Sequence, residues 1–130
     1  MDTAEIFKVL GDENRLRIMN LLLQRELCVG ELELILQTTQ SNTSRHLNRL
    51  RQVGLIEANK QAQWVHYQPG KDFSGEWKEL GAFLKNRFMQ SPRFLEDSKR
   101  MEKYLASKYT CQQIRENSAE VKAYLEEEVK

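Results

Sequence analysis

Residues 39–54 read TQSNTSRHLNRLRQVG, and this stretch has the marks of one helix with a signal at each end. Thr39 is a favourable N-cap residue because its hydroxyl can accept a hydrogen bond from a free backbone N–H. Gly54 stands where a glycine commonly follows the last helical turn. The stretch therefore predicts a helix over about residues 40–53.

The two faces of this helix differ in chemistry. Leu47, Leu50 and Val53 recur at a spacing of three and can anchor one face to a core. The opposite face carries short polar side chains near its start and arginines further along. Gln and Asn can bond adenine, Arg can bond guanine, and a helix N-terminus attracts phosphate. An ordinary amphipathic surface helix shows a similar polar face, so the neighbouring elements decide between the two interpretations.

Three shorter apolar series precede it and predict helices over residues 3–10, 13–24 and 29–36. After the long helix the period changes. Residues 55–58 and 64–67 form two β-prone runs, separated by a polar tip at 59–63 whose turn type the sequence leaves open. A helix-turn-helix followed by a two-stranded wing is an architecture that binds duplex DNA.

The remainder of the chain is predicted to be helical. We expect a fifth helix over about residues 74–90, a further helix over 93–109, and a last one starting at Thr110. The last helix is weakly apolar, so we expect it either to fray or to bend near Asn117. The predicted fold is mainly α with a small β-hairpin, a winged helix-turn-helix plus a C-terminal helical extension. We assign residues 1–90 to the DNA-binding and dimerisation domain and 91–130 to the extension.

Charge is distributed unevenly along a chain whose formal net charge is only +1. Residues 37–71 hold five Lys or Arg and one acid, a local net charge of +4. Residues 1–36 hold four bases and seven acids, a local net charge of −3. A basic segment of this kind is typical of a surface that meets phosphates, although a solvated basic face gives the same pattern.

Ten residues are the predicted DNA contacts. We expect four on the long helix to face base edges: Gln40, Ser41, Asn42 and Arg45. Four more are expected to touch phosphates or to pin the helix: Thr39, Ser44, His46 and Arg49. Two at the hairpin tip are the expected wing contacts: Lys60 and Gln63.

Several short motifs in one register resemble the ArsR/SmtB family of bacterial winged-helix repressors. They are Glu26-Leu27-Cys28-Val29-Gly30-Glu31-Leu32, Ser44-Arg45-His46-Leu47, Gly54-Leu55-Ile56 and Trp64-Val65-His66-Tyr67. The resemblance covers about residues 3–90. It implies homodimers paired through the first and fifth helices, binding to an inverted repeat at a promoter, and release by an inducer.

The sensor residues depart from the family pattern. Arsenic-sensing members carry Cys-x-Cys at the start of the third helix. Here Cys28 matches the first cysteine, and Gly30 stands at the position of the second. The predicted fifth helix has no histidine of the kind that zinc-sensing members use. We therefore predict no metal site and no cofactor. Cys111 can join Cys28 in one thiol site only if the extension folds back, and two reduced, separate thiols are the simpler expectation.

These observations favour a DNA-binding repressor, homodimeric and cytoplasmic, released by an unidentified small-molecule or redox inducer. Double-stranded DNA and a second copy are the expected partners, and no apolar run is long enough for a membrane span. Two alternatives stay open: a winged-helix module whose C-terminal helices bind a protein, and a thiol- or As(III)-responsive repressor using Cys28 and Cys111. The sequence has no nucleophile with a base in a motif, no glycine-rich phosphate loop and no cluster of metal ligands, so nothing in it indicates an enzyme.

Overall fold

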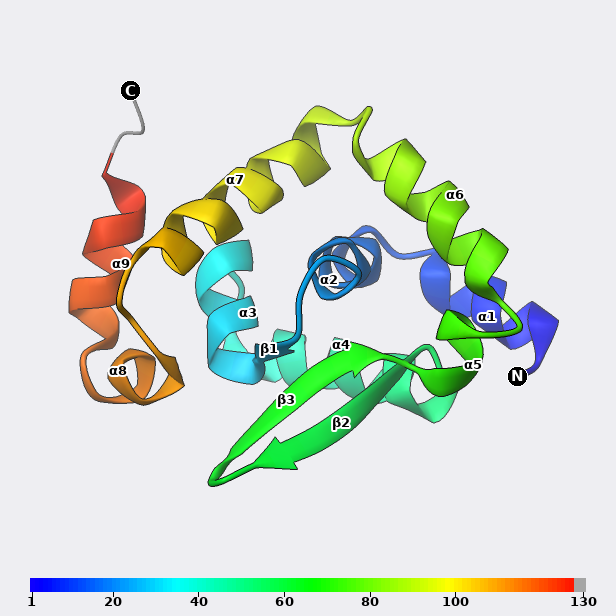
Figure 1. Ribbon diagram of the computed structural model, residues 1–130, viewed down its shortest axis with the longest axis horizontal. Helices are drawn as coiled ribbons and strands as arrows, with labels where there is room; N and C mark the ends of the chain where they lie inside the picture. Colours follow the sequence, from blue (N-terminus) through cyan, green and yellow to red (C-terminus); the bar gives the residue numbers. More distant parts are fainter. Residues whose placement is uncertain (128–130) are drawn as a thin grey trace.

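A computed structural model describes residues 1–127, so the last three residues of the predicted extension, 128–130, lie outside the described part. The structure is mostly helical with one small sheet, which confirms the predicted fold class (Figure 1). The elements follow one another as α1 (Thr3–Leu10), α2 (Glu13–Leu22), β1 (Leu27–Cys28), α3 (Val29–Leu36), α4 (Gln40–Gln52), β2 (Ile56–Gln61), β3 (Trp64–Pro69), α5 (Lys71–Ser74), α6 (Lys78–Phe88), α7 (Pro92–Ala106), α8 (Cys111–Glu116) and α9 (Ser118–Glu126).

Local capping chemistry fixes several helix ends where the sequence placed them. Asp12 and Thr39 accept hydrogen bonds from the backbone N–H groups three residues further on, at the starts of α2 and α4. Thr110 and Gln113 form a reciprocal capping box at the start of α8. Gly54 follows α4 with a φ of 84°, a backbone conformation that favours glycine. The predicted bend near Asn117 is also present, because α8 ends before it and α9 begins after it.

The predicted fifth helix over residues 74–90 is shorter than expected, because α6 spans Lys78–Phe88 and a separate short helix, α5, precedes it. Gly75 ends the short helix α5, and its N–H donates to the carbonyl groups of Lys71 and Asp72. The N–H of Trp77 donates a hydrogen bond to the carbonyl of Asp72 just before α6 begins. The chain therefore turns between the two helices instead of continuing along one axis.

The sheet has three antiparallel strands in the order β1-β3-β2, and the strand β1 was absent from the sequence prediction. The hairpin strands are longer than expected, because the pairing of Gln61 with Trp64 leaves only a two-residue turn. Ala62 in that turn has a φ of 57°. Lys60 therefore lies within β2 opposite Val65, not in a loop, whereas Gln63 is in the turn.

One apolar core joins all parts of the described chain. It includes Leu32 and Ile35 of α3, Leu47 and Leu50 of α4, and also side chains of α7, α8 and α9: Met101, Tyr104, Ile114, Val121 and Leu125. Figure 1 shows α7 running over α2 and α3 from α6 to the last two helices. The C-terminal extension is thus packed on the helix-turn-helix through shared buried surface.

Polar contacts fix α7 in place. Arg17 of α2 makes a buried ion pair with Asp97, with Nε to Oδ2 at 2.7 Å. The hydrogen bond to Asp97, opposed by burial, raises the pKa of Arg17 above its ordinary value. Arg100 donates to the carbonyl of Ile35 at 2.9 Å, and Asn20 donates to that of Phe94 at 3.0 Å. These contacts connect α7 to both α2 and α3.

The two cysteines form a disulfide between Cys28 and Cys111, with 6.7 Å between their Cα atoms. The expectation of two separate reduced thiols is therefore wrong for this structure. The C-terminal extension folds back onto the helix-turn-helix, which was the condition for Cys28 and Cys111 to share one site. No helix among residues 1–127 is both long and apolar enough to cross a bilayer.

Candidate nucleic-acid interface

The long helix α4 is anchored by its inner face. Leu47 and Leu50 are almost fully buried, and so is Thr43 one turn earlier. This face packs on α2 and α3 and beside the hairpin strand β2. The side chains of the opposite face are consequently held on a rigid support, which precise recognition of a surface requires.

The first turn of α4 is fixed by hydroxyl groups. Thr39 accepts a hydrogen bond from the N–H of Asn42 at 3.2 Å. The hydroxyl of Thr43 donates to the carbonyl of Thr39 at 2.9 Å and lies 2.6 Å from the hydroxyl of Thr38. The helix N-terminus, where free N–H groups attract anions, is therefore well ordered.

Four predicted base contacts are exposed on this first part of α4: Gln40, Ser41, Asn42 and Arg45. Arg45 donates from Nη2 to the Oδ1 atom of Asn42 at 3.1 Å, so these two side chains lie together. Asn48 is absent from the predicted contacts, yet it is exposed one further turn along the same face as Arg45. The i,i+3 spacing from Arg45 is the signal that identifies it.

The residues predicted to touch phosphate or pin the helix fall into two groups. Thr39 is exposed, and Ser44 and Arg49 are half-buried. Arg49 also lies 3.9 Å from Glu5 of α1, which ties α4 to the first helix. His46 differs from all of these because it is only 6% exposed.

His46 faces the interior between α4 and α2. Its Nδ1 atom lies 3.4 Å from Nη1 of Arg15. Burial lowers the pKa of His46, the nearby Arg15 and Arg45 lower it further, and Asp12 acts in the opposite sense. This position fits the helix-pinning role, and we leave His46 out of the proposed DNA surface.

The wing presents its two predicted contacts to solvent. Lys60 on β2 and Gln63 in the turn are both exposed. Glu26, in the loop before β1, accepts a hydrogen bond from Gln61 of β2. One of its carboxylate oxygens also lies 3.6 Å from Nδ1 of His66 on β3. These two contacts connect the hairpin to the loop before β1. The wing is thus supported at its far end as well as at its base.

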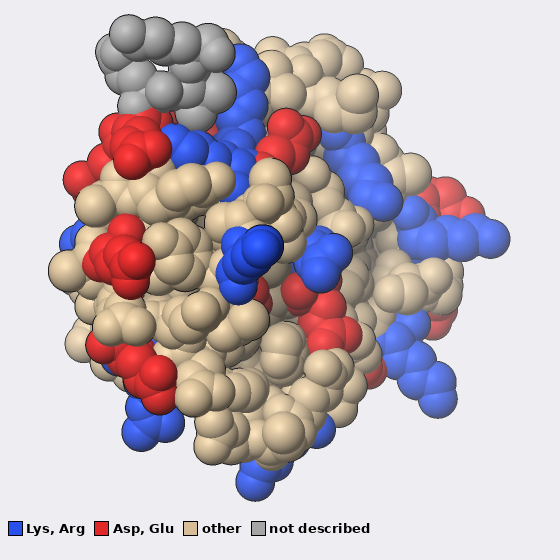
Figure 2. Space-filling model, turned by 60° about the vertical axis from the view of Figure 1, so that its left-hand side comes forward, with Lys and Arg blue, Asp and Glu red and all other residues tan. Residues whose placement is uncertain are grey.

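The face that carries the C-terminal helices has a different character. In Figure 2 the side of the molecule with α8 and α9 comes forward, and acidic and basic side chains are interspersed on it. No single sign of charge dominates the part of this face that the structure describes. The local charge of +4 belongs instead to residues 37–71, which contain α4 and the hairpin.

A supported helix with an exposed polar and basic face, followed by a β-hairpin, defines the winged helix-turn-helix class. A family model described as bacterial regulatory protein, arsR family, matches residues 12–58. The cadmium resistance transcriptional regulatory protein CadC homolog of Staphylococcus aureus is 35% identical over 92 residues, which are 70% of this chain and 75% of that protein. The chain belongs to the arsR family.

Other relatives agree over shorter segments. The arsenical resistance operon repressor of Escherichia coli K12 is 48% identical over 65 residues, which are 49% of this chain and 56% of that protein. The chain thus matches little more than half the length of this relative. The solved structure of HlyU from Vibrio cholerae N16961 is 36% identical, has a TM-score of 0.59, and covers 66% of this chain and 90% of its own.

These comparisons confirm the winged helix-turn-helix fold predicted from the order of elements, and they also confirm the resemblance to the ArsR/SmtB family. The family is one of regulatory proteins, so the prediction that the chain is not an enzyme is confirmed too. The matched segment begins at the N-cap of α2 and ends within β2. Helices α5 to α9 lie outside that segment.

Proposed function

We propose that this protein is a transcriptional repressor that binds an inverted-repeat operator as a homodimer and is released by an inducer. The observation that carries this proposal is the exposed first half of α4, held by buried anchors beside the wing. Two such units, related by a two-fold axis, match the symmetry of an inverted repeat. Because its ligand is promoter DNA, we place its action in the cytoplasm.

The proposed contacts divide by chemistry. Gln40 and Asn42 can pair bidentately with adenine, and Arg45 with guanine, when α4 enters the major groove. Thr39, Ser44 and Arg49 are assigned to phosphates, with Ser41 at a base edge. On the wing, Lys60 and Gln63 are assigned to the DNA backbone, which positions the protein without selecting sequence.

A gel-shift titration with duplex DNA from the region upstream of the gene tests this function. The wild-type protein should give a dimer-sized complex that weakens steeply as salt is raised. Arg45→Ala should weaken the specific complex about 10- to 100-fold, because a bidentate base contact contributes about 1–3 kcal/mol of discrimination. Affinity for unrelated duplex should fall much less.

Two further variants calibrate the test. Lys60→Ala should weaken binding to all duplexes alike and reduce the salt dependence by about one phosphate contact. Lys99→Ala, which removes an exposed lysine of α7, should leave both affinities unchanged. Absence of any complex with duplex DNA at low salt would overturn the proposal.

A further inference from the structure

The disulfide joins two parts of the molecule that serve different purposes. Cys28 lies where β1 ends and α3 begins, directly beside β3 of the wing through its pairing with His66. Cys111 is the first residue of α8, 83 positions further along the chain. The bond therefore connects the DNA-binding unit to the start of α8, in the middle of the C-terminal extension.

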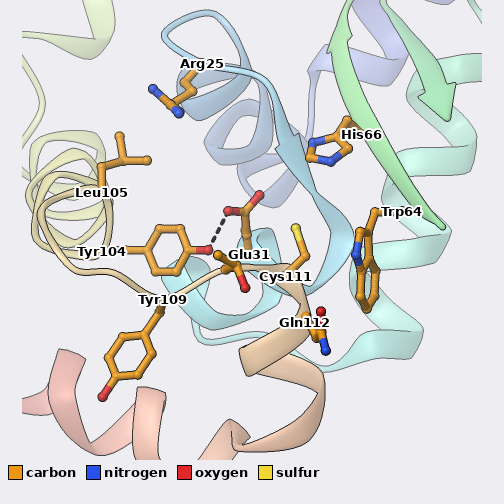
Figure 3. Close-up of a pocket in the computed structure, with 10 residues that line it drawn as sticks. Arg25, Glu31, Trp64, His66, Tyr104, Leu105, Tyr109, Cys111 and Gln112 are labelled. Carbon is orange, nitrogen blue, oxygen red and sulfur yellow. Dashed lines mark hydrogen bonds between the residues drawn. The ribbon is translucent and has the colours of Figure 1, made fainter. Parts of the chain in front are cut away.

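A buried carboxylate organises the surroundings of the two sulfurs. Glu31 accepts a hydrogen bond from the N–H of Cys28 at Oε1, 2.8 Å, and one from the Tyr104 hydroxyl at Oε2, 2.5 Å. Figure 3 shows the Tyr104 hydroxyl pointing at Glu31, with Cys111 beside them. Burial and this hydrogen bond raise the pKa of Tyr104, so its hydroxyl remains a donor at neutral pH.

This arrangement favours sulfur chemistry over metal binding. The Cys28, Cys111 and Glu31 ligand atoms lie within 4.8 Å of one another, which is close enough for a shared ion. Glu31 accepts one hydrogen bond at each oxygen, from the N–H of Cys28 and from the Tyr104 hydroxyl. The two sulfurs are bonded to each other in this structure, and a pair of cysteines is sufficient for a reversible disulfide.

Small reagents can approach the pair from two sides. Cys111 lines a cavity of about 490 Å³ together with Glu31 and Tyr104. It also lines a second cavity of about 840 Å³, this time together with Cys28. Cys28 is only 3% exposed whereas Cys111 is half-buried and lines both cavities, so Cys111 is the more accessible of the two.

The second cavity shows what the bond controls. Its walls come from α3, α8 and α9, and also from Gln40 at the start of α4 and Gln63 in the wing turn. The Cγ2 atom of Ile114 in α8 lies 3.4 Å from where a Cβ would stand on Gly30. Arg115 lies over the Trp64 ring of β3 at 5.8 Å. The bond therefore holds α8 and α9 beside two proposed DNA contacts.

We propose that Cys28 and Cys111 form a reversible redox clamp that lowers DNA affinity when closed by a hydroperoxide. Cys111 thiolate attacks the peroxide, giving a sulfenic acid and an alcohol, or water from hydrogen peroxide. Cys28 then displaces water from that sulfur and forms the S–S bond, so two thiols lose two electrons and two protons in total. A dithiol reductant reverses the step by thiol–disulfide exchange.

The direction of the effect follows from geometry. In the closed form α8 and α9 are tethered beside Gln40 and Gln63, where a duplex lying across α4 and the wing would pass. Reduction removes the covalent tether and leaves α8 and α9 held by noncovalent packing alone, so these two helices separate more easily from α3 and the wing. The inference rests on the proposed DNA-binding function for its readout.

The test compares full-length reduced protein with protein oxidised by one equivalent of hydrogen peroxide. Oxidation should lower the intact mass by two hydrogens without a covalent dimer on non-reducing gels. Affinity for the operator duplex should fall at least about 10-fold and return after dithiothreitol. Cys28→Ser and Cys111→Ser should each bind as the reduced wild type does and ignore peroxide.

The outcomes separate the two proposals. If the reduced wild type binds no duplex, the DNA-binding function fails, while the mass change still reports on the bond. If the reduced protein binds and the oxidised protein binds equally well, the redox clamp is wrong. It is also wrong if peroxide produces a disulfide between two chains, or if either serine variant still responds.

Discussion

At the scale of single residues, His46 shows how the recognition helix is held by a buried polar group. Its ring is nearly covered, and its Nδ1 atom faces the guanidinium of Arg15 at 3.4 Å. A neutral ring can accept a hydrogen bond there, whereas a protonated ring would place two positive groups against each other. The fold therefore prefers the neutral form of His46.

This preference predicts acid sensitivity. Because the pKa of folded His46 lies below its ordinary 6.5, the unfolded chain takes up this proton first as pH falls. The contribution of His46 is complete above about pH 6.5 and is lost as pH falls below that value. Urea unfolding at pH 7.5 and 5.5 should show a smaller acid loss for His46→Gln than for the wild type. His66→Gln serves as the control, and an unchanged difference for His46→Gln would contradict the prediction.

At the scale of elements, features set by neighbouring residues were predictable and features set by distant contacts were not. The bounds of α1 and α3, and the start of α4, follow from capping residues and apolar spacing within each segment. Strand β1 has two residues and exists only because β3 pairs with it. The meeting of Cys28 with Cys111 likewise depends on how α7 packs over α2 and α3. The exposure of Gln40, Ser41, Asn42 and Arg45 was predictable, while the burial of His46 needed the packed structure.

The base of the wing depends on a close backbone approach. A Cβ atom on Gly70 would lie 2.1 Å from the carbonyl oxygen of Gly54. The N–H of Gly70 donates to the carbonyl of Leu55 at 2.8 Å, which closes the hairpin just after α4. Only a residue without a side chain fits between these two segments.

Gly70→Ala should therefore destabilise the fold by about 2 kcal/mol or more, since backbone must move to relieve the clash. Gly11→Ala is the matched control, because its Cβ would meet nothing closer than 3.4 Å. The control should change the free energy of unfolding by less than about 0.5 kcal/mol. Urea denaturation of both variants measures the difference. Equal free energies of unfolding for the two variants would show that the backbone at the base of the wing accommodates a Cβ atom without losing stability.

At the scale of the whole molecule, the two ends present different surfaces. Helices α8 and α9 occupy one end, while α1 and α6 lie toward the other (Figure 1). Phe7 on α1 is 57% exposed, Phe83 on α6 is 60% exposed, and Met89 just after α6 is 70% exposed. Large apolar side chains left open in one chain are typical of a surface that another chain covers. The division into a domain over residues 1–90 and an extension stays a prediction, although both parts share one core.

We expect the surface around Phe7 and Phe83 to be the dimer interface, as the family resemblance implies for the first and fifth helices. Phe83→Glu should convert the dimer to a monomer, because burying an unpaired carboxylate costs several kcal/mol. Sedimentation velocity at micromolar concentration measures the mass, and operator affinity should fall at least 10-fold with it, since one half-site contact is lost. Leu95→Glu on α7 is the matched control, being 40% exposed but on another helix, and should remain dimeric. A dimer that persists in Phe83→Glu with unchanged thermal stability would place the interface elsewhere.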